Sequence, residues 1–106
     1  MMNLDMDAMR QASLQASRLM KVLSNPDRLL ILCQLAQGER RVGELEALLG
    51  IVQPTLSQQL TVLRDEALVV TRREGKHVHY RIDNPVVLSV IDVLHANFCG
   101  TKEQAP

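Results

Sequence analysis

The sequence predicts a mainly helical domain in which two short helices, joined by a tight turn, are followed by a two-stranded hairpin. Leucines at helical spacing lie on both sides of Gly50, and glycine is the residue that most easily ends a helix. Apolar and polar residues then alternate over 77–82, which is typical of a strand with one buried face. Apolar residues before and after this region follow the helical period. The predicted fold class is therefore a winged helix-turn-helix, with the order helix, helix, helix, helix, strand, strand, helix.

The length and composition indicate one domain, which we place at residues 6–99 with flexible ends at 1–5 and 100–106. Apolar residues make up 46% of the chain but aromatic residues only 2%, so a single copy buries a modest area. We therefore expect a homodimer. No signal-peptide pattern and no stretch long enough to cross a membrane are present, so we expect a cytoplasmic protein without a membrane partner.

The first third of the chain predicts two helices. Residues 6–23 follow the helical period without glycine or proline, and the segment Ser-Asn-Pro-Asp at 24–27 ends this helix and caps the next. Residues 28–37 are apolar on nearly all sides, so we expect them at the centre of the core, with Gly38 at their end. The charged residues 39–41 are interpreted as a solvated connector.

Residues 42–66 predict the helix-turn-helix itself. A helix over 42–49 ends at Gly50, and a second begins near Pro54, which suits a first helical position. In the second helix, Leu56, Leu60 and Leu63 form a buried stripe, and short polar side chains face away from it. Such side chains can read base edges in a DNA major groove, although an ordinary polar surface is the alternative. The candidate base-reading residues are Gln53, Thr55, Ser57, Gln58 and Thr61.

The hairpin predicted over 67–73 and 77–82 carries positive charge on its exposed side and tip. A basic hairpin after a helix-turn-helix can contact phosphates beside the groove, and a hairpin with ordinary polar residues is the alternative. The candidate DNA-contacting residues are Arg72, Arg73, Lys76 and His77, with His79 on the same exposed side. The zero net charge of the chain counts against a nucleic-acid binder, but residues 53–82 hold five Arg and Lys residues against three Asp and Glu.

Asn84 and Pro85 begin a last helix that has two apolar surfaces. One stripe consists of Val87, Val90, Ile91, Leu94 and Phe98, and the second surface of Val86, Leu88 and Val93. The stripe can pack on its own domain, whereas the second surface needs a partner. We therefore expect this helix and the first helix to form a symmetric dimer interface.

The segment RVGELEALLGIVQPTLSQQLTVLRDEALVVTRREGKHVHYRI resembles the ArsR/SmtB family of bacterial winged-helix repressors. The resemblance extends over residues 19–99 and includes SNPDRLLIL, VGEL, QPTLSQQL and HVHYRI in the family's order. It implies a homodimer, joined through its first and last helices, that represses transcription by binding an imperfect inverted repeat in double-stranded DNA. One position departs from the pattern, because Val52 stands where the family usually has a capping serine. Loss of a cap costs on the order of 1 kcal/mol.

Many members of this family bind metal ions, and two of their sites can be compared with this chain. The positions that match the family's C-x-C motif are Arg41 and Gly43, so that site is absent. Asp92 and His95 share a face of the last helix, but the family's second ligand pair has no counterpart. We therefore expect no metal site and no cofactor, and a metal-responsive repressor stays an alternative.

The two cysteines, Cys33 and Cys99, suggest a different input. A cysteine in an apolar helix is usually a small core residue. The contexts Ile31-Leu32-Cys33 and Asn97-Phe98-Cys99, however, resemble those of the BigR, SqrR and HlyU branch of the family. In that branch the cysteine pair forms a disulfide or polysulfide bridge that weakens DNA binding. The resemblance implies that Cys33 and Cys99 are sensor thiols and that reactive sulfur or an oxidant is the inducer.

Two further functions compete with this interpretation. A regulator without thiol switching would act by competing with other DNA-binding proteins at promoters. A thiol enzyme would use Cys33 as nucleophile and Cys99 as resolving thiol, but the sequence has no Cys-x-x-Cys pair and no Gly-rich phosphate loop. We therefore expect a protein that is not an enzyme.

Overall fold

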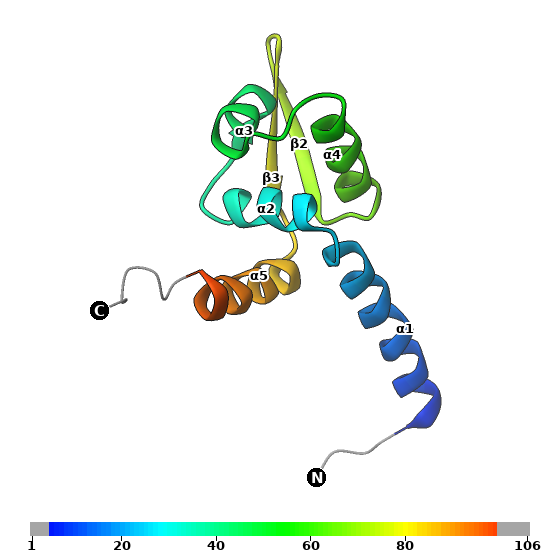
Figure 1. Cartoon of the computed structure of the whole chain (residues 1–106). Helices are drawn as coiled ribbons and strands as arrows, with labels where there is room; N and C mark the ends of the chain where they lie inside the picture. Colours follow the sequence, from blue (N-terminus) through cyan, green and yellow to red (C-terminus); the bar gives the residue numbers. More distant parts are fainter. Residues whose placement is uncertain (1–4, 100–106) are drawn as a thin grey trace, which may run out of the picture.

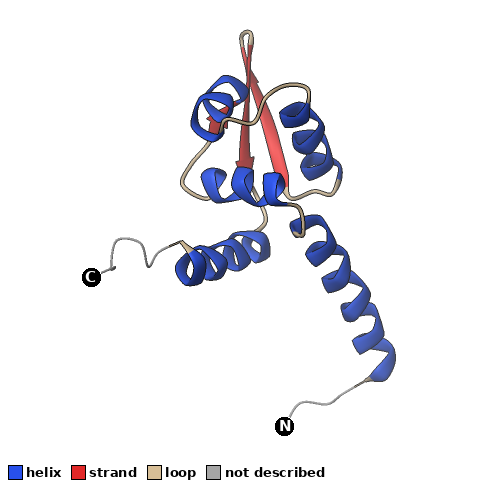
Figure 2. Ribbon diagram, viewed as in Figure 1, coloured by secondary structure: helices blue, strands red, loops and turns tan. Residues whose placement is uncertain are grey.

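The computed structural model describes residues 5–99, and its elements follow the predicted order with one added strand. The helices are α1 (Met6–Leu23), α2 (Pro26–Leu35), α3 (Val42–Leu49), α4 (Thr55–Asp65) and α5 (Pro85–Phe98). The strands are β1 (Arg40–Arg41), β2 (Val69–Glu74) and β3 (His77–Ile82). The hairpin tip, α3 and α4 lie at one end of the molecule, and α1 and α5 lie at the other (Figures 1 and 2).

The strands form one antiparallel sheet in the order β1-β3-β2. Within the hairpin, the register runs from Val69 opposite Ile82 to Glu74 opposite His77. The added strand corrects the interpretation of residues 39–41 as a solvated connector, because Arg40 pairs with Tyr80 along the outer edge of β3. This pairing satisfies backbone groups that would otherwise be left open at a sheet edge.

The core lies where α2, α3, α4 and α5 meet the sheet. Ile31 and Leu32 of α2 are fully buried, which confirms that this helix is central. The leucine stripe of α4 is buried as predicted. Val87 and Ile91 attach α5 to the same core. Because these aliphatic contacts fix the inward side of α4, its polar side is held toward solvent.

In three of the helices the side chain of the N-cap residue itself caps the first turn. The Asn25 side chain accepts a hydrogen bond from the backbone N–H of Arg28 at the start of α2, as predicted. The Asn84 side chain accepts hydrogen bonds from the backbone N–H groups of Val86 and Val87 at the start of α5, also as predicted. Asp5 was expected in a flexible end, but its side chain accepts from two backbone N–H groups in the first turn of α1. The other residues of the predicted flexible ends, 1–4 and 100–106, lie outside the described part of the chain.

The helices α1 and α5 expose much apolar surface. On α1 only Val22 and Leu23 are buried, and Leu19 is half-buried against the core. Four other large apolar residues of this helix are exposed: Met6, Met9, Leu14 and Met20. The second surface of α5 is exposed as predicted, at Val86, Leu88 and Val93. The first stripe is shorter than predicted, because Phe98 extends past the core and is 78% exposed. Among residues 5–99, no helix combines the length and the apolar character needed to span a bilayer.

Candidate nucleic-acid interface and thiol pair

The polar side of α4 is the centre of the candidate DNA-binding surface. Gln53, Ser57, Gln58 and Thr61 are exposed, while Thr55 is half-buried. Leu56, Leu60 and Leu63 lie on the opposite side and hold the helix against the core. The helix therefore presents donors and acceptors along one solvent-facing surface, as the sequence predicts.

The start of α4 differs in detail from the prediction. Pro54 is the N-cap residue rather than the first helical residue, and neither it nor Val52 provides a side-chain cap. Gln53 takes this role, because its Oε1 accepts from the backbone N–H of Ser57 at 3.1 Å and from Ser57 Oγ at 2.6 Å. The expected weakness at the helix start is thereby offset by a neighbouring side chain.

Hydrogen bonds at the start of α4 and within it distinguish candidate base-reading residues that are already engaged from Gln58, which is not. Ser57 is engaged with Gln53, and Thr61 Oγ1 donates to the carbonyl oxygen of Ser57 at 2.9 Å. In the described chain, the Gln58 side chain makes no hydrogen bond, so its amide is available to a ligand. Arg64 lies three residues after Thr61 and is also exposed on α4. Helical spacing from Thr61 is the signal by which Arg64 could have been added to the predicted site.

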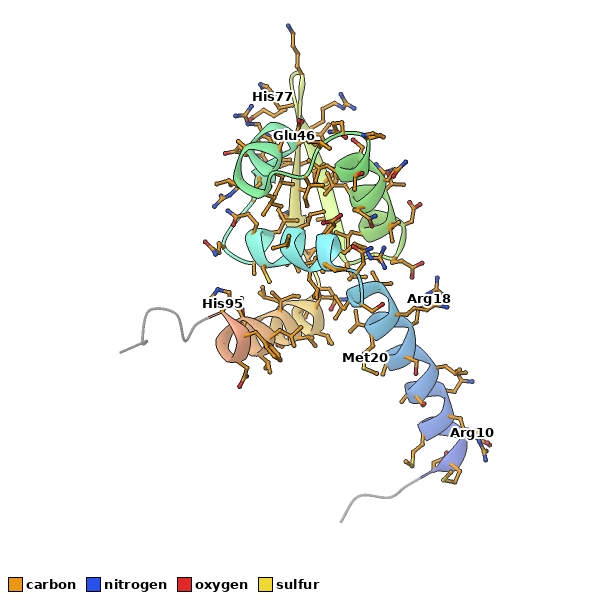
Figure 3. All side chains as sticks on the ribbon, in the orientation of Figure 1. Arg10, Arg18, Met20, Glu46, His77 and His95 are labelled. Atoms are coloured by element: carbon orange, nitrogen blue, oxygen red, sulfur yellow. The ribbon has the colours of Figure 1, made fainter. Side chains whose placement is uncertain are left out.

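The candidate phosphate-contacting residues of the hairpin do not share one environment. Arg72 is bound by Glu39, whose oxygens lie 2.9 and 3.0 Å from Arg72 Nε. This hydrogen bond holds the pKa of Glu39 below its ordinary value, and the carboxylate offsets the charge of Arg72. Arg73 and Lys76 are exposed, and within residues 5–99 neither forms an ion pair. His77 Nδ1 lies 3.4 Å from Arg41 Nη1, near the hairpin tip (Figure 3).

The placement of His79 corrects a prediction. We expected it on the exposed side of the hairpin, but its side chain is only 14% exposed. Its Nδ1 lies 3.7 Å from Glu39 Oε1 and its Nε2 lies 3.4 Å from Glu74 Oε1. The strand that residues 40–41 add beside β3 brings Glu39 to this position, and the carboxylates then cover the imidazole.

The two cysteines, far apart in the sequence, line the same cavity between α2 and α5. Cys33 is half-buried on α2, and Cys99 is exposed at the end of α5. The cavity measures about 440 Å³, and the rest of its lining is Pro26, Leu29, Leu30, Leu94, His95 and Phe98. Burial raises the pKa of the Cys33 thiol, and the nearby charge of a Cys99 thiolate raises it further. Cys99 is therefore the more accessible nucleophile of the pair.

Asp92 and His95 of α5 lie beside this cavity. Together with Cys33 they line a smaller cavity of about 90 Å³. In the part of the chain that the structure describes, no group of three or more His, Cys, Asp or Glu side chains is arranged to hold a metal ion.

Comparison with known proteins gives the family. The family described as "Bacterial regulatory protein, arsR family" matches residues 25–71, from the cap of α2 into β2. The biofilm growth-associated repressor of Agrobacterium fabrum is 49% identical over 96 residues, which cover 91% of this chain and 82% of that protein. This chain belongs to the ArsR family. It is a transcription regulator of that family and not an enzyme, as the sequence predicts.

Solved structures agree with the ArsR fold and assembly. Reduced HlyU from Vibrio cholerae superposes with a TM-score of 0.84 at 39% identity, over 89% of this chain and 99% of that one. A homodimeric winged helix-turn-helix DNA-binding domain from Mycobacterium bovis gives a TM-score of 0.73 at 35% identity, over 90% and 88% of the two chains. The winged helix-turn-helix class is thus confirmed, and the homodimeric neighbour agrees with the predicted ArsR-type dimer.

Proposed function

We propose that this ArsR-family regulator is a homodimeric repressor that releases its operator when Cys33 and Cys99 become linked through sulfur. The observation that supports the proposal is an apolar cavity that both thiols line. One wall of this cavity is α2, the central helix of the core, and the other is α5, which exposes a second apolar surface. A covalent link across the cavity would connect the DNA-binding half of the molecule to the candidate dimer interface.

In the proposed complex, α4 enters the major groove of an inverted-repeat operator and the hairpin contacts phosphates. The base-reading residues are Gln53, Thr55, Ser57, Gln58 and Thr61, and the hairpin contacts are Arg72, Arg73, Lys76 and His77. Because Glu39 binds Arg72, that arginine reaches a phosphate only by exchanging one anionic partner for another. Arg73 and Lys76 therefore carry most of the electrostatic contribution of the hairpin.

The proposed chemistry begins at Cys99, the exposed thiol. Its thiolate attacks the terminal sulfur of a persulfide RSSH, which forms a Cys99 persulfide and releases the thiolate RS⁻. The Cys33 thiolate then attacks Cys99 Sγ itself, the inner sulfur of the persulfide. A Cys33–Cys99 disulfide forms, the bond from Cys99 Sγ to the outer sulfur breaks, and hydrosulfide leaves with the electron pair of that bond. The two cysteine thiols are oxidised and the persulfide is reduced to a thiol and hydrosulfide, without another oxidant. Transfer of further sulfur before closure gives a longer bridge, which spans a greater distance.

A change at the dimer interface can alter operator affinity because two recognition helices must fit two half-sites about 34 Å apart. Figure 1 shows α5 and α1 at the end of the molecule opposite to the hairpin tip. One similar structure is described as reduced HlyU, so oxidation state was a variable of interest for that protein. This supports a comparison of the reduced and oxidised forms of this chain.

The test compares operator binding by the reduced protein with binding by the persulfide-treated protein. Fluorescence anisotropy measures the affinity for DNA from the region upstream of the protein's own coding sequence. We expect tight binding by the reduced protein and at least a tenfold loss after treatment with an organic persulfide, with mass spectrometry showing the two thiols linked. Cys33→Ser should bind as the wild type does and keep its affinity after treatment.

Two results would contradict parts of the proposal. Unchanged affinity in a protein whose thiols are fully linked would refute the switch and leave DNA binding intact. Absence of binding by the reduced dimer to any inverted-repeat fragment selected from a random DNA pool would refute operator recognition itself.

A further inference from the structure

The helix α1 has few contacts that could fix its direction. It contains 18 residues, which corresponds to a length of about 27 Å. Only Val22 and Leu23 at its C-terminal end are buried, and the helix then extends away from the core (Figure 1). Leu19, one turn earlier, is half-buried against the core as well. Burial of these aliphatic side chains holds the end of the helix in place but is not directional. Other contacts must therefore define its angle.

A cleft separates the C-terminal part of α1 from α4. Its volume is about 340 Å³, and its lining residues are Arg18, Lys21, Val22, Arg28, Val62 and Glu66. Continuous apolar packing therefore does not join the two helices at this place. Hydrogen bonds from two arginines span the cleft instead.

The first of these arginines is Arg28, in the first turn of α2. Its Nε donates to the carbonyl oxygen of Val22 at 2.6 Å and its Nη2 to that of Lys21 at 3.5 Å. Its Nη1 donates to Gln59 Oε1 on α4 at 2.9 Å. The carbonyl oxygens at the C-terminus of a helix lack partners within the helix and attract a cation. One guanidinium thus connects the end of α1 to the recognition helix.

The second arginine is Arg18, one helical turn before the end of α1. Its Nε donates to Glu66 Oε1 at 2.8 Å and its Nη2 to Glu66 Oε2 at 3.2 Å. Glu66 is the C-cap residue of α4. Such a paired contact fixes the orientation of both groups as well as their separation. Arg18 lies on one side of α1, and Met20 points to the side that faces α5 (Figure 3).

We propose that Arg18 and Arg28 are positioning residues that fix the angle between α1 and α4, and thereby the half-site spacing that the dimer accepts. The inference rests on the proposed function, in which α1 contributes to the dimer interface and α4 reads DNA. It adds that Arg18 and Arg28 connect α1 to α4, so that a change in the angle of one helix changes the position of the other.

The size of the effect follows from the length of α1. A tilt of about 5° about its buried end displaces the far end of a helix of about 27 Å by roughly 2 Å. Because α1 contacts the partner subunit in this proposal, the displacement changes the separation of the two recognition helices. One base pair adds about 3.4 Å to the distance between half-sites. Loss of the arginine contacts should therefore broaden the range of spacings that the dimer tolerates.

The experiment measures affinity for operators whose half-sites are moved apart or together by one and two base pairs. For the wild type we expect one preferred half-site spacing. Operators whose spacing differs from it by one base pair should bind with at least tenfold lower affinity. Arg18→Glu and Gln59→Leu should reduce this discrimination to threefold or less. Affinity for DNA with a single half-site should change by less than twofold, because the base-reading residues are untouched.

Two controls separate positioning from general stability. The exchanged pair Arg18→Glu with Glu66→Arg should restore discrimination to within twofold of the wild type. Arg10→Glu removes an exposed arginine of α1 whose ion-pair partner is Asp7 of the same helix, at 3.7 Å, and should leave discrimination unchanged.

The possible failures are distinguishable. If both Arg18→Glu and Gln59→Leu discriminate between half-site spacings as strongly as the wild type does, the positioning role is overturned and operator binding stands. An equal loss for single and paired half-sites would also overturn it, because the contacts would then support α4 itself. A wild type that binds neither kind of DNA would refute the proposed function together with the inference.

Discussion

At the scale of single residues, Gln53 shows how a missing cap is offset. Its side-chain oxygen accepts two hydrogen bonds from Ser57, so the start of α4 has a partner that Val52 does not supply. Gln58 lies on the same surface but makes no side-chain hydrogen bond among residues 5–99. We therefore expect Gln53 to contribute to the stability of α4 as well as to the proposed DNA contact, and Gln58 to contribute to DNA binding alone.

We expect Gln53→Ala to lower the free energy of unfolding by about 1 kcal/mol, the usual effect of removing a helix cap. Gln58→Ala should change it by less than about 0.5 kcal/mol, as is usual for exposed positions, and should weaken operator binding at least fivefold. Urea unfolding and fluorescence anisotropy measure the two quantities. Equal destabilisation by both substitutions would show that Gln53 does not cap α4.

The two thiols should differ in reactivity. Burial raises the pKa of Cys33, whereas Cys99 is exposed at the end of α5. Because the thiolate is the reactive form, we expect iodoacetamide to label Cys99 at least five times faster than Cys33 at pH 7. Mass spectrometry of peptides at successive times measures the two rates, and the urea-unfolded protein, in which the rates should converge, is the control. Faster labelling of Cys33 would contradict the order of steps proposed for the switch.

At the scale of elements, the hairpin should bind DNA mainly through Arg73 and Lys76. Each of Arg73→Ala and Lys76→Ala should weaken operator binding and reduce the slope of log affinity against log salt by about 1, for one lost phosphate contact. Arg72→Ala should have a smaller effect, because Glu39 already offsets its charge. Titrations at several salt concentrations measure these slopes. A larger effect of Arg72→Ala would mean that the Glu39 pair opens in the complex.

The elements differ in how far the sequence predicts them. The stripe at Leu56, Leu60 and Leu63 and the alternation over 77–82 are local patterns, and both elements form as predicted. The strand β1 has no such pattern, because two arginines become a strand only when the edge of β3 lies beside them. The burial of His79 has the same origin, since it depends on Glu39, a residue distant in the sequence.

The candidate site shows the same limit. Helical spacing predicts which side of α4 faces solvent, but it does not reveal that Gln53 and Ser57 bind each other. The sequence also cannot give the packing of α2 against α5, on which the shared cavity of Cys33 and Cys99 depends. Long-range packing, rather than local preference, decides these features.

At the scale of the whole molecule, three carboxylates link stability to pH. Hydrogen bonds from Arg72, from the backbone N–H of Arg41 and from Arg18 hold the pKa values of Glu39, Glu44 and Glu66 below their ordinary value of 4.5. A carboxyl whose pKa is lower in the folded state stabilises the fold above its unfolded pKa, and this contribution is lost as pH falls through the folded pKa.

We therefore expect the free energy of unfolding to be nearly constant from pH 7 to about 5 and to fall below about 4.5, where these carboxyls take up protons. The combined variant Glu39→Gln, Glu44→Gln, Glu66→Gln should be less stable at pH 7 and should show a shallower decline in acid. Urea unfolding at pH 7, 5, 4 and 3 measures both. An unchanged acid decline in the variant would assign the effect to other groups.

We expect the dimer to form through apolar surface that one chain leaves exposed on α5. Val93→Glu places a charge on the second surface of α5, where the native side chain is 60% exposed, so the fold of the subunit should persist. We expect this variant to be monomeric by sedimentation and to lose at least 50-fold in operator affinity. Leu48→Glu, at a position 56% exposed on α3, should remain dimeric. A dimeric Val93→Glu protein would exclude this part of α5 from the interface.

The buried leucine stripe of α4 has a consequence for how such a regulator diverges after gene duplication. The stripe lies between the core and the exposed side of α4, where Gln58 and Thr61 are found. The cavity lined by Cys33 and Cys99 lies elsewhere, between α2 and α5. If Gln58 and Thr61 read DNA as proposed, mutations at these outward positions would redirect one copy to new promoters and leave the thiol pair unchanged. If the cavity holds the proposed switch, mutations around it would give the other copy a new stimulus while it still binds the original promoters.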